Sequence, residues 1–371
     1  MIGSMKCPSV ADLEGGIMSG LINYLAALHD CGGSDLHLAS GVPPVVRVYG
    51  ALKTLDSPPL SPEEVAALAC EVLPDEGRMK LLENKNVDFA EEIDLGEGRG
   101  VWRYRGNAYF QKNGINVVMR AISAKVPTLA ELNMPDILAK FVKYHHGLVL
   151  ATGQAGCGKS STIAAMINLI NETRSVHVIT IEDPIEYLFV NNKALINQRQ
   201  VGRDVESFSL ALKGALREDP DVIFVGELRD LETISLAITA AETGHLVLGT
   251  LHTNSAAKTV DRLIDAFPIE QQAQIRTMLS ESLRGVVAQQ LIPRADGQGR
   301  AVAVEILVNN VSVANSIRDG KTYQIPMTMQ TGRKVGMCTM DSAILKLYED
   351  GIISKEEASS RSINKAPYRQ N

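Results

Sequence analysis

Short apolar runs alternate with longer mixed segments through the second half of the chain. Each run has the length of a strand and is almost wholly apolar. The runs lie at Leu148–Ala151, Val176–Ile181, Val222–Val225, Leu246–Leu251 and Val302–Val308. Continuous apolar strands separated by helices indicate a largely parallel sheet that helices cover on both faces. We therefore predict an α/β fold for this half of the chain.

The first half has a different pattern, in which strands predominate. We predict helices over Leu21–His29 and Ser61–Leu73. In the second helix Ser61 suits the N-cap, Pro62 suits the first turn, and two glutamates follow near the positive end of the helix. The predicted strands lie at Leu36–Leu38, Val45–Leu55, Val87–Leu95 and within Val101–Ile122, separated by glycine-rich turns. This half is therefore expected to be α+β.

A length of 371 residues favours two domains, because a single core rarely grows that large. The change of pattern places the boundary. We predict an N-terminal domain over residues 15–126 and a C-terminal domain over residues 136–371, joined by a connector over 127–135. Residues 1–14 are short, mixed and without pattern, and we expect them to be mobile.

The composition is that of a soluble globular protein, with 45% hydrophobic and 22% charged residues. The net charge of −6 argues against a nucleic-acid partner, which needs clustered positive charge. No apolar run approaches the roughly 20 residues of a membrane span, and no signal peptide is visible. We expect a cytoplasmic protein without a transmembrane segment. The five cysteines show no CxxC spacing, so neither a zinc site nor a disulfide framework is indicated.

A complete phosphate-binding loop follows the first apolar run of the second half. Gly153 and Gly158 permit backbone conformations that a Cβ atom would block, so N–H groups can surround phosphates at the start of the next helix. Lys159 would bind the β- and γ-phosphates of ATP, and the Ser160 hydroxyl would bind Mg²⁺. The nucleotide-binding residues expected here are Gly153, Gln154, Ala155, Gly156, Cys157, Gly158, Lys159, Ser160 and Ser161. Positive surroundings favour a thiolate, so Cys157 is also a candidate for oxidation.

Carboxylates follow two further apolar strands. Glu227 comes directly after Val222–Val225 and a glycine, as in a Walker-B element. It could bind Mg²⁺ through water or polarise the attacking water. Three acids, Asp183 and Glu186 among them, follow Val176–Ile181, and we expect Asp183 near the metal. The alternative is that these acids only cap strand ends or form a charged turn.

Two histidines bracket the apolar strand Leu246–Leu251. His252, at its carboxyl end, could sense the γ-phosphate, while His245 could orient the segment or meet a neighbouring subunit. Asp183, Glu227, His252 and the phosphate loop all follow the carboxyl ends of predicted parallel strands. Open α/β sheets bind ligands in that crevice. The convergence favours ATP hydrolysis over nucleotide binding alone, although two purely structural histidines are the alternative.

Three arginines, Arg103, Arg105 and Arg120, lie on predicted strands of the N-terminal half. The ATPase site has no arginine of its own near the loop. An arginine supplied from elsewhere can accelerate phosphoryl transfer on the order of 10³- to 10⁵-fold. The three arginines are therefore candidate nucleotide-binding residues, and a solvated basic face of a sheet is the alternative.

With these stretches the chain resembles the PilT-type retraction ATPases of the wider secretion-ATPase superfamily, from about Gly20 to Ala358. The resemblance is carried by Ser34–Pro44, the phosphate loop, Thr180–Tyr187 (an "Asp box"), Ala215–Asp230, Thr243–Thr253 (a "His box"), Ile317–Pro326 and Met337–Asp341. The chain lacks the four-cysteine zinc module of the related assembly ATPases.

The resemblance implies a PAS-like N-terminal domain followed by a RecA-like ATPase domain with a helical C-terminal region. It implies hydrolysis of ATP with Mg²⁺ in a homohexamer at the cytoplasmic face of the inner membrane. A pilus platform protein is the implied partner, and a paralogous motor is a further candidate. The catalytic glutamate falls on Glu227, the Asp-box acid on Glu186 and the two histidines on His245 and His252, beside Lys159. The three arginines become trans-acting fingers.

Two hypotheses of function stay open. The first is a hexameric motor that powers type IV pilus retraction and twitching motility. The family's C-terminal AIRNLIRE motif appears here as Ser312–Asp319, with Ala314 in the place of an arginine. The second hypothesis is therefore a ring subunit that binds nucleotide and modulates a sister motor. A RecA-like nucleic-acid motor is disfavoured by the acidic balance of the chain.

The phosphate loop also departs from the usual pattern. Family members have Pro-Thr where this chain has Gln154 and Ala155, and a serine where it has Cys157. Backbone groups bind the phosphates at these positions, so we expect ATPase activity to survive.

Overall fold

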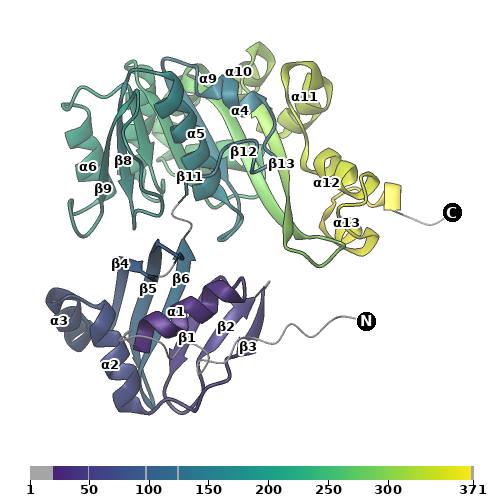
Figure 1. Ribbon diagram of the computed structural model, residues 1–371. Helices are drawn as coiled ribbons and strands as arrows, with labels where there is room; N and C mark the ends of the chain where they lie inside the picture. Colours follow the sequence, from purple (N-terminus) through teal and green to yellow (C-terminus); the bar gives the residue numbers. More distant parts are fainter. Residues whose placement is uncertain (1–19, 49, 97, 123–124, 369–371) are drawn as a thin grey trace. The chain divides into compact units, whose positions relative to one another are not determined.

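The chain folds into two compact units that divide between Lys125 and Val126 (Figure 1). This computed structural model describes residues 20–48, 50–96, 98–122 and 125–368. The segment predicted to be mobile, residues 1–14, lies outside the described residues. Leu129 and Met134, in the stretch predicted as a connector, pack against the core of the second unit.

The first unit is built on a six-stranded sheet in the order β3-β2-β1-β6-β5-β4, with every neighbouring pair antiparallel. Its strands are β1 (Asp35–Ala39), β2 (Val45–Val48), β3 (Ala51–Thr54), β4 (Asn86–Asp94), β5 (Val101–Gln111) and β6 (Gly114–Ile122). Its helices are α1 (Gly20–Asp30), α2 (Pro62–Val72) and α3 (Asp75–Asn84). The apolar sides of α1 and α2 pack on one face of the sheet, around Leu36 and Tyr104.

The start of α2 follows from local chemistry. The Ser61 hydroxyl accepts a hydrogen bond from the Glu64 N–H at 3.1 Å, and the Glu64 carboxylate accepts one from the Ser61 N–H at 2.6 Å. This capping box satisfies two N–H groups that the first turn leaves open. The predicted N-cap at Ser61, and Pro62 in the first turn, are confirmed.

The single strand predicted over Val45–Leu55 is wrong. The structure forms a hairpin of β2 and β3, in which Val48 pairs with Ala51. Gly50 has φ +89°, a left-handed conformation that favours glycine and reverses the chain. Gly50 therefore marks the turn between the two strands.

The second unit is built on a seven-stranded sheet in the order β13-β12-β7-β11-β10-β8-β9. Every neighbouring pair is parallel except β12 with β13. The strands are β7 (Gly147–Thr152), β8 (His177–Glu182), β9 (Leu195–Gln200), β10 (Val222–Val225), β11 (Leu246–Leu251), β12 (Leu283–Pro293) and β13 (Arg300–Val308). The predicted, largely parallel sheet is confirmed.

Helices cover both faces of this sheet. One apolar core contains α4 and α5, and the other contains α6 to α11. The helices are α4 (Ile137–Phe141), α5 (Lys159–Thr173), α6 (Phe208–Ala215), α7 (Leu231–Glu242), α8 (Ala256–Asp265), α9 (Ile269–Ser282), α10 (Val311–Arg318) and α11 (Ile325–Thr331). Two further helices, α12 (Met340–Glu349) and α13 (Lys355–Arg361), form a small core with the outer part of β12 and β13.

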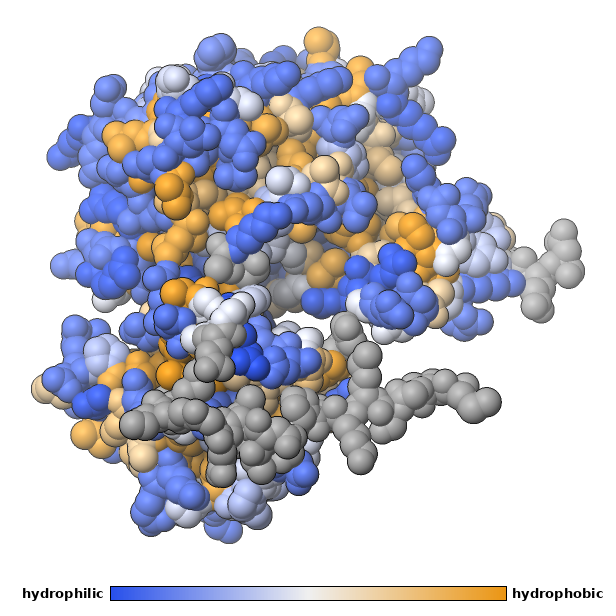
Figure 2. Space-filling view, viewed as in Figure 1, coloured by the Kyte–Doolittle hydropathy of each residue, from blue (hydrophilic) through white to orange (hydrophobic). Residues whose placement is uncertain are grey.

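Short 3₁₀ helices complete the C-terminal region at Thr322–Gln324, Gly332–Val335 and Ala366–Tyr368. Among the described residues no helix has both the length and the apolar character needed to cross a bilayer. On the face drawn in Figure 2, hydrophilic residues predominate and apolar ones lie between them.

Candidate active site

The phosphate loop joins β7, which is buried along its whole length, to α5. Gly153 has φ +143°, and a Cβ atom there would lie 2.5 Å from both the Cys157 Sγ and the Gln289 carbonyl oxygen. Gly158 has φ +94° and is the N-cap of α5. Both positions therefore require glycine, as predicted. The loop ends at a helix N-terminus, where free N–H groups and the helix dipole favour an anion.

Lys159 is only 9% exposed and is held by the loop itself. Its Nζ donates to the carbonyl oxygens of Gly153 at 2.8 Å and Gln154 at 3.1 Å, and lies 3.4 Å from the His252 Nδ1. Burial lowers the pKa of Lys159, and the nearby Cys157, Glu227 and Glu186 partly oppose that shift. The Lys159 amine thus donates to two neutral carbonyl oxygens of the loop, and the charges of Glu227 and Glu186 act on it.

Glu227 lies two residues beyond β10 and holds two partners. Its Oε2 lies 2.7 Å from the Arg229 guanidinium, and its Oε1 lies 3.2 Å from the His252 Nε2. Burial works to raise the pKa of this carboxyl, but the hydrogen bond and charge of Arg229 and the contact with His252 lower it below its usual range. The group is therefore a carboxylate, and the structure brings together Lys159, His252 and Glu227 as predicted.

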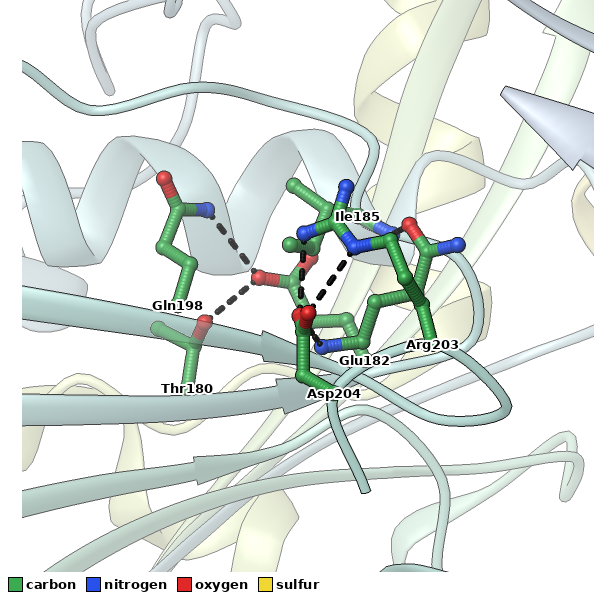
Figure 3. A network of polar contacts seen from close by, with 7 residues as sticks. Thr180, Glu182, Ile185, Gln198, Arg203 and Asp204 are labelled. Carbon is green, nitrogen blue, oxygen red and sulfur yellow. Dashed lines mark hydrogen bonds and ion pairs between the residues drawn. The ribbon is translucent and has the colours of Figure 1, made fainter. Parts of the chain in front are cut away.

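The Asp box follows β8 and contains one buried acid and two more accessible ones. Glu182 is 8% exposed, and burial raises its pKa to about 7 despite hydrogen bonds from Thr180, Gln198 and the Glu186 N–H. Figure 3 shows Thr180 and Gln198 directed at the Glu182 carboxyl group. Asp183 is exposed and Glu186 is half-buried. Glu186 precedes Tyr187, whose hydroxyl lies 2.8 Å from the Ser161 hydroxyl in the first turn of α5, and the charge of Glu186 acts to raise the pKa of Lys159.

His245 lies at the other edge of the sheet from these residues. It precedes β11, whose first residue, Leu246, pairs with Gly147 and Val222 at the amino ends of the neighbouring strands. Its Nδ1 lies 3.0 Å from the Ala240 carbonyl oxygen. Within this chain His245 is thus not brought to the phosphate loop, because a strand of six residues separates it from His252. Its role toward nucleotide remains a prediction about an assembly.

The three arginines lie on the sheet of the first unit, where Arg105 pairs with Arg120 across β5 and β6. The Arg120 Nε donates to the Asp35 Oδ1 at 2.7 Å, while 63% of the Arg120 side chain is exposed. Arg103 is 9% exposed, with a guanidinium nitrogen 3.6 Å from the Glu92 Oε1. Arg105 and Arg120 are thus the more accessible members of this set.

Cys157 differs from expectation. Its side chain is 6% exposed, and burial raises its pKa although the Lys159 charge lowers it in part. The expected bias toward the thiolate is wrong, because desolvation outweighs the single neighbouring cation.

Comparison with known proteins identifies the family. The family model described as type II/IV secretion system protein matches residues 73–337. The chain belongs to this family. It is 48% identical over 327 residues to the type IV pilus retraction ATPase PilT of Pseudomonas aeruginosa, covering 88% of this chain and 93% of the relative. It is 41% identical to the type IV pilus ATPase PilU of the same organism, covering 88% and 84%.

A solved structure of the pilus retraction motor PilT with bound ADP matches with a TM-score of 0.84 and 44% identity, covering 94% of this chain and 98% of that one. The chain is thus a PilT-type ATPase, an ATP-hydrolysing enzyme that binds nucleotide. Its fold class, an N-terminal α+β domain followed by a RecA-like ATPase domain, is confirmed by the same match.

The residues of this PilT-type site suit a magnesium nucleotide. Hydroxyl and carboxylate oxygens are the ligands that Mg²⁺ prefers, and it usually keeps several waters and phosphate oxygens. Ser160 lies in the first turn of α5 and supplies the hydroxyl. Both Glu227 oxygens already have protein partners, so contact through water fits this residue better than direct ligation. Among the described residues no group of three acidic, histidine or cysteine side chains could hold a metal alone.

Sequence reasoning missed Arg229 and Tyr187. Arg229 follows Glu227 by two residues and binds it, so the spacing was available as a signal. The Tyr187 hydroxyl lies 2.8 Å from the Ser161 hydroxyl and so connects the Asp box to α5. No spacing in the sequence indicates that contact, because 26 residues separate the two partners.

Proposed function

We propose that this protein powers the retraction of type IV pili by hydrolysing ATP as one subunit of a homohexamer. The motor would work from the cytoplasmic face of the inner membrane on a pilus platform protein. The geometry of Lys159, Glu227 and His252 at the carboxyl ends of parallel strands supports the ATPase chemistry. The match to PilT over most of both chains supports the retraction role.

In this proposal the phosphate loop binds the triphosphate of ATP through its N–H groups and the N-terminus of α5. Lys159 exchanges the carbonyl oxygens of Gly153 and Gln154 for the β- and γ-phosphate oxygens. That exchange replaces neutral partners with charged ones, so phosphate gives the buried amine a better partner. Mg²⁺, held by Ser160 and, through water, by Asp183 and Glu227, would neutralise charge on the phosphates.

Glu227 is the residue that polarises the attacking water. It is ionised and lies at the strand end beside His252, which orients it through Oε1. Glu186 and Asp183 add negative charge on the Asp-box side, where Mg²⁺ and its waters would lie. In this proposal Glu227 accepts the proton of the water, while Lys159 and the N–H groups of the loop bind the γ-phosphate.

The experiment is the turnover of ATP by a Glu227→Gln variant. The substitution keeps the size of the side chain and removes the proton acceptor, so kcat should fall on the order of 100-fold or more. Glu232→Gln is the matched control, because Glu232 is an exposed acid in the first turn of α7 that pairs with Lys213 and Ser209. Turnover near wild type for Glu227→Gln would remove this residue from the mechanism.

The arginines of the first unit would complete a neighbouring subunit's site. Lys159 is the cation that the phosphate loop itself supplies, and Arg229 is engaged by Glu227, so a further cation for the γ-phosphate would come from a neighbouring subunit. Arg105 and Arg120 are accessible on their sheet, which supports a role across a subunit interface. The assembly is tested by sedimentation with ATP, which should give a species of six chains.

A second candidate function is a ring subunit that modulates a sister motor. The observation that favours it is Ala314, half-buried on α10 where PilT-type chains carry an arginine. An Ala314→Arg variant introduces this arginine into α10 and leaves the rest of the helix as in the wild-type chain. If only this variant retracts pili without a sister motor, the wild-type protein is a modulator.

A further inference from the structure

The Asp-box loop, residues 183–190, has an unusual source of hydrogen bonds. Several of its backbone groups bond to side chains, from the flanking strands β8 and β9 and from α5. The Gln198 Oε1 accepts from the Phe189 N–H at 3.0 Å, and its Nε2 donates to the Tyr187 carbonyl oxygen at 2.8 Å. The Gln200 Oε1 accepts from the Ile185 N–H at 3.3 Å.

The buried carboxylate of Glu182 completes this set. It accepts from the Thr180 hydroxyl at 2.7 Å, from the Gln198 Nε2 at 3.2 Å and from the N–H of Glu186. In Figure 3 the Thr180 hydroxyl and the Gln198 amide, from neighbouring strands, both point at one oxygen of the Glu182 carboxyl group. Burying a carboxylate is costly unless several donors surround it, and here three do so. The third donor is the backbone N–H of Glu186, the acid whose charge raises the pKa of Lys159.

The far side of the loop is tied to the helix that follows the phosphate loop. The Tyr187 hydroxyl lies 2.8 Å from the Ser161 hydroxyl, and the Asn171 Nδ2 donates to the Val190 carbonyl oxygen at 2.8 Å. Both contacts are on α5. The loop is therefore fixed to β8 and β9 on one side and to α5 on the other, with Glu186 between the two attachments.

We infer that Glu182 and Gln198, supported by Gln200, are positioning residues that hold Glu186 at the phosphate loop. We call these three side chains the Asp-box clamp. None of them needs to touch the nucleotide, since they act through the backbone of the loop. This inference rests on the proposed function of Glu186 in ATP hydrolysis. The Asp-box clamp explains how the irregular loop over residues 183–190 keeps the Glu186 side chain in one position.

The test uses Gln198→Leu in the full-length protein, which removes every bond of the amide and keeps a similar volume. The first readout is hydrogen exchange of the peptide that covers residues 183–190. Loss of hydrogen bonds to the loop should raise its exchange on the order of tenfold. Arg199→Gln is the matched control, because Arg199 is the next residue on β9 and pairs with Glu218 instead. It should leave exchange of the loop unchanged.

The second readout is kinetic. With Glu186 misplaced, Gln198→Leu should lower kcat about 10- to 100-fold, while ADP affinity stays within about threefold because the phosphate loop is intact. A purely structural role would lower the melting temperature and ADP affinity together. Unchanged exchange of the loop, or unchanged kcat despite faster exchange, would overturn the inference.

A double-mutant cycle separates this inference from the proposed function. In single-turnover assays, Gln198→Leu should add little to the defect of Glu186→Gln, because residues that act through one group are not additive. Fully additive losses would contradict the clamp. Wild-type turnover by Glu186→Gln would instead contradict the role of Glu186 itself. If Gln198→Leu does not fold, Thr180→Val removes only one donor to Glu182 and takes its place.

Discussion

His252 Nε2 lies 3.2 Å from Oε1 of Glu227, while Nδ1 of the same ring lies 3.4 Å from Nζ of Lys159. One imidazole thus connects the acid at the end of β10 to the lysine of the phosphate loop. We expect this contact to let Glu227 respond to a γ-phosphate bound at Lys159. The three residues follow β10, β11 and β7, of which β11 lies between the other two and is parallel to both.

His252→Ala is expected to lower kcat about 10- to 100-fold, because Glu227 loses the partner that orients it. Nucleotide affinity should change much less, since the phosphate loop stays intact. The measurement is steady-state ATP turnover beside an ADP titration. His145→Ala is the control, because His145 is exposed on the segment before β7. Equal turnover by His252→Ala and wild type would contradict this role.

The arginines of the first unit should separate into two classes. Arg105→Gln and Arg120→Gln should each lower kcat, on the order of 10-fold or more, if the side chains complete a neighbouring site. Arg103 is buried and paired with Glu92, so Arg103→Gln should mainly lower the melting temperature. Turnover and thermal unfolding of the three variants give the comparison. Loss of stability without loss of kcat for Arg105→Gln and Arg120→Gln would favour the solvated basic face.

Much of the ATPase unit was predictable because five of its seven strands are mainly apolar runs and its loop follows a strict glycine pattern. Gly153 and Gly158 have positive φ, as their residue type predicts, because a glycine has no Cβ atom to clash in that conformation. Strand β9 was missed because Leu195–Gln200 is mostly polar, and its glutamines serve the Asp-box loop. Helix α3 was missed because only Gly77 and Leu81 are buried, so no apolar stripe marks it.

Contacts between distant side chains that no motif marks could not be predicted. The pair of Tyr187 with Ser161, and the pair of Gln198 with Glu182, depend on the order of strands in the sheet. Desolvation is equally invisible in a sequence. The Cys157 thiol illustrates it, since its neighbours are charged and yet burial sets the direction of its pKa.

Cys157 should therefore react slowly with thiol reagents. Burial and a raised pKa both reduce the thiolate that attacks such reagents. Cys70 is exposed and serves as an internal reference. Mass spectrometry after limited iodoacetamide treatment should find Cys70 modified well before Cys157, with ATP turnover retained. Modification of Cys157 at a rate equal to that of Cys70 would contradict the burial argument.

Glu305 should make stability depend on pH. Burial raises its pKa, although the N–H groups of Ala256 and Met340 bond to it, so the folded state holds its proton to higher pH than the unfolded state. Its contribution to stability is then lost as the pH rises from its unfolded pKa through its folded one. Glu305→Gln should flatten that slope of the melting temperature above about pH 4.5, the usual pKa of the group. Parallel slopes for the variant and wild type would contradict the assignment.

The most direct test of the account is twitching motility in a strain that lacks its own retraction ATPase. The wild-type chain should restore twitching, and the Glu227→Gln variant, produced at the same level, should not. Restoration by both would show that retraction does not depend on this ATPase site. Active ATP turnover by the wild-type protein without any twitching would contradict the proposed motor.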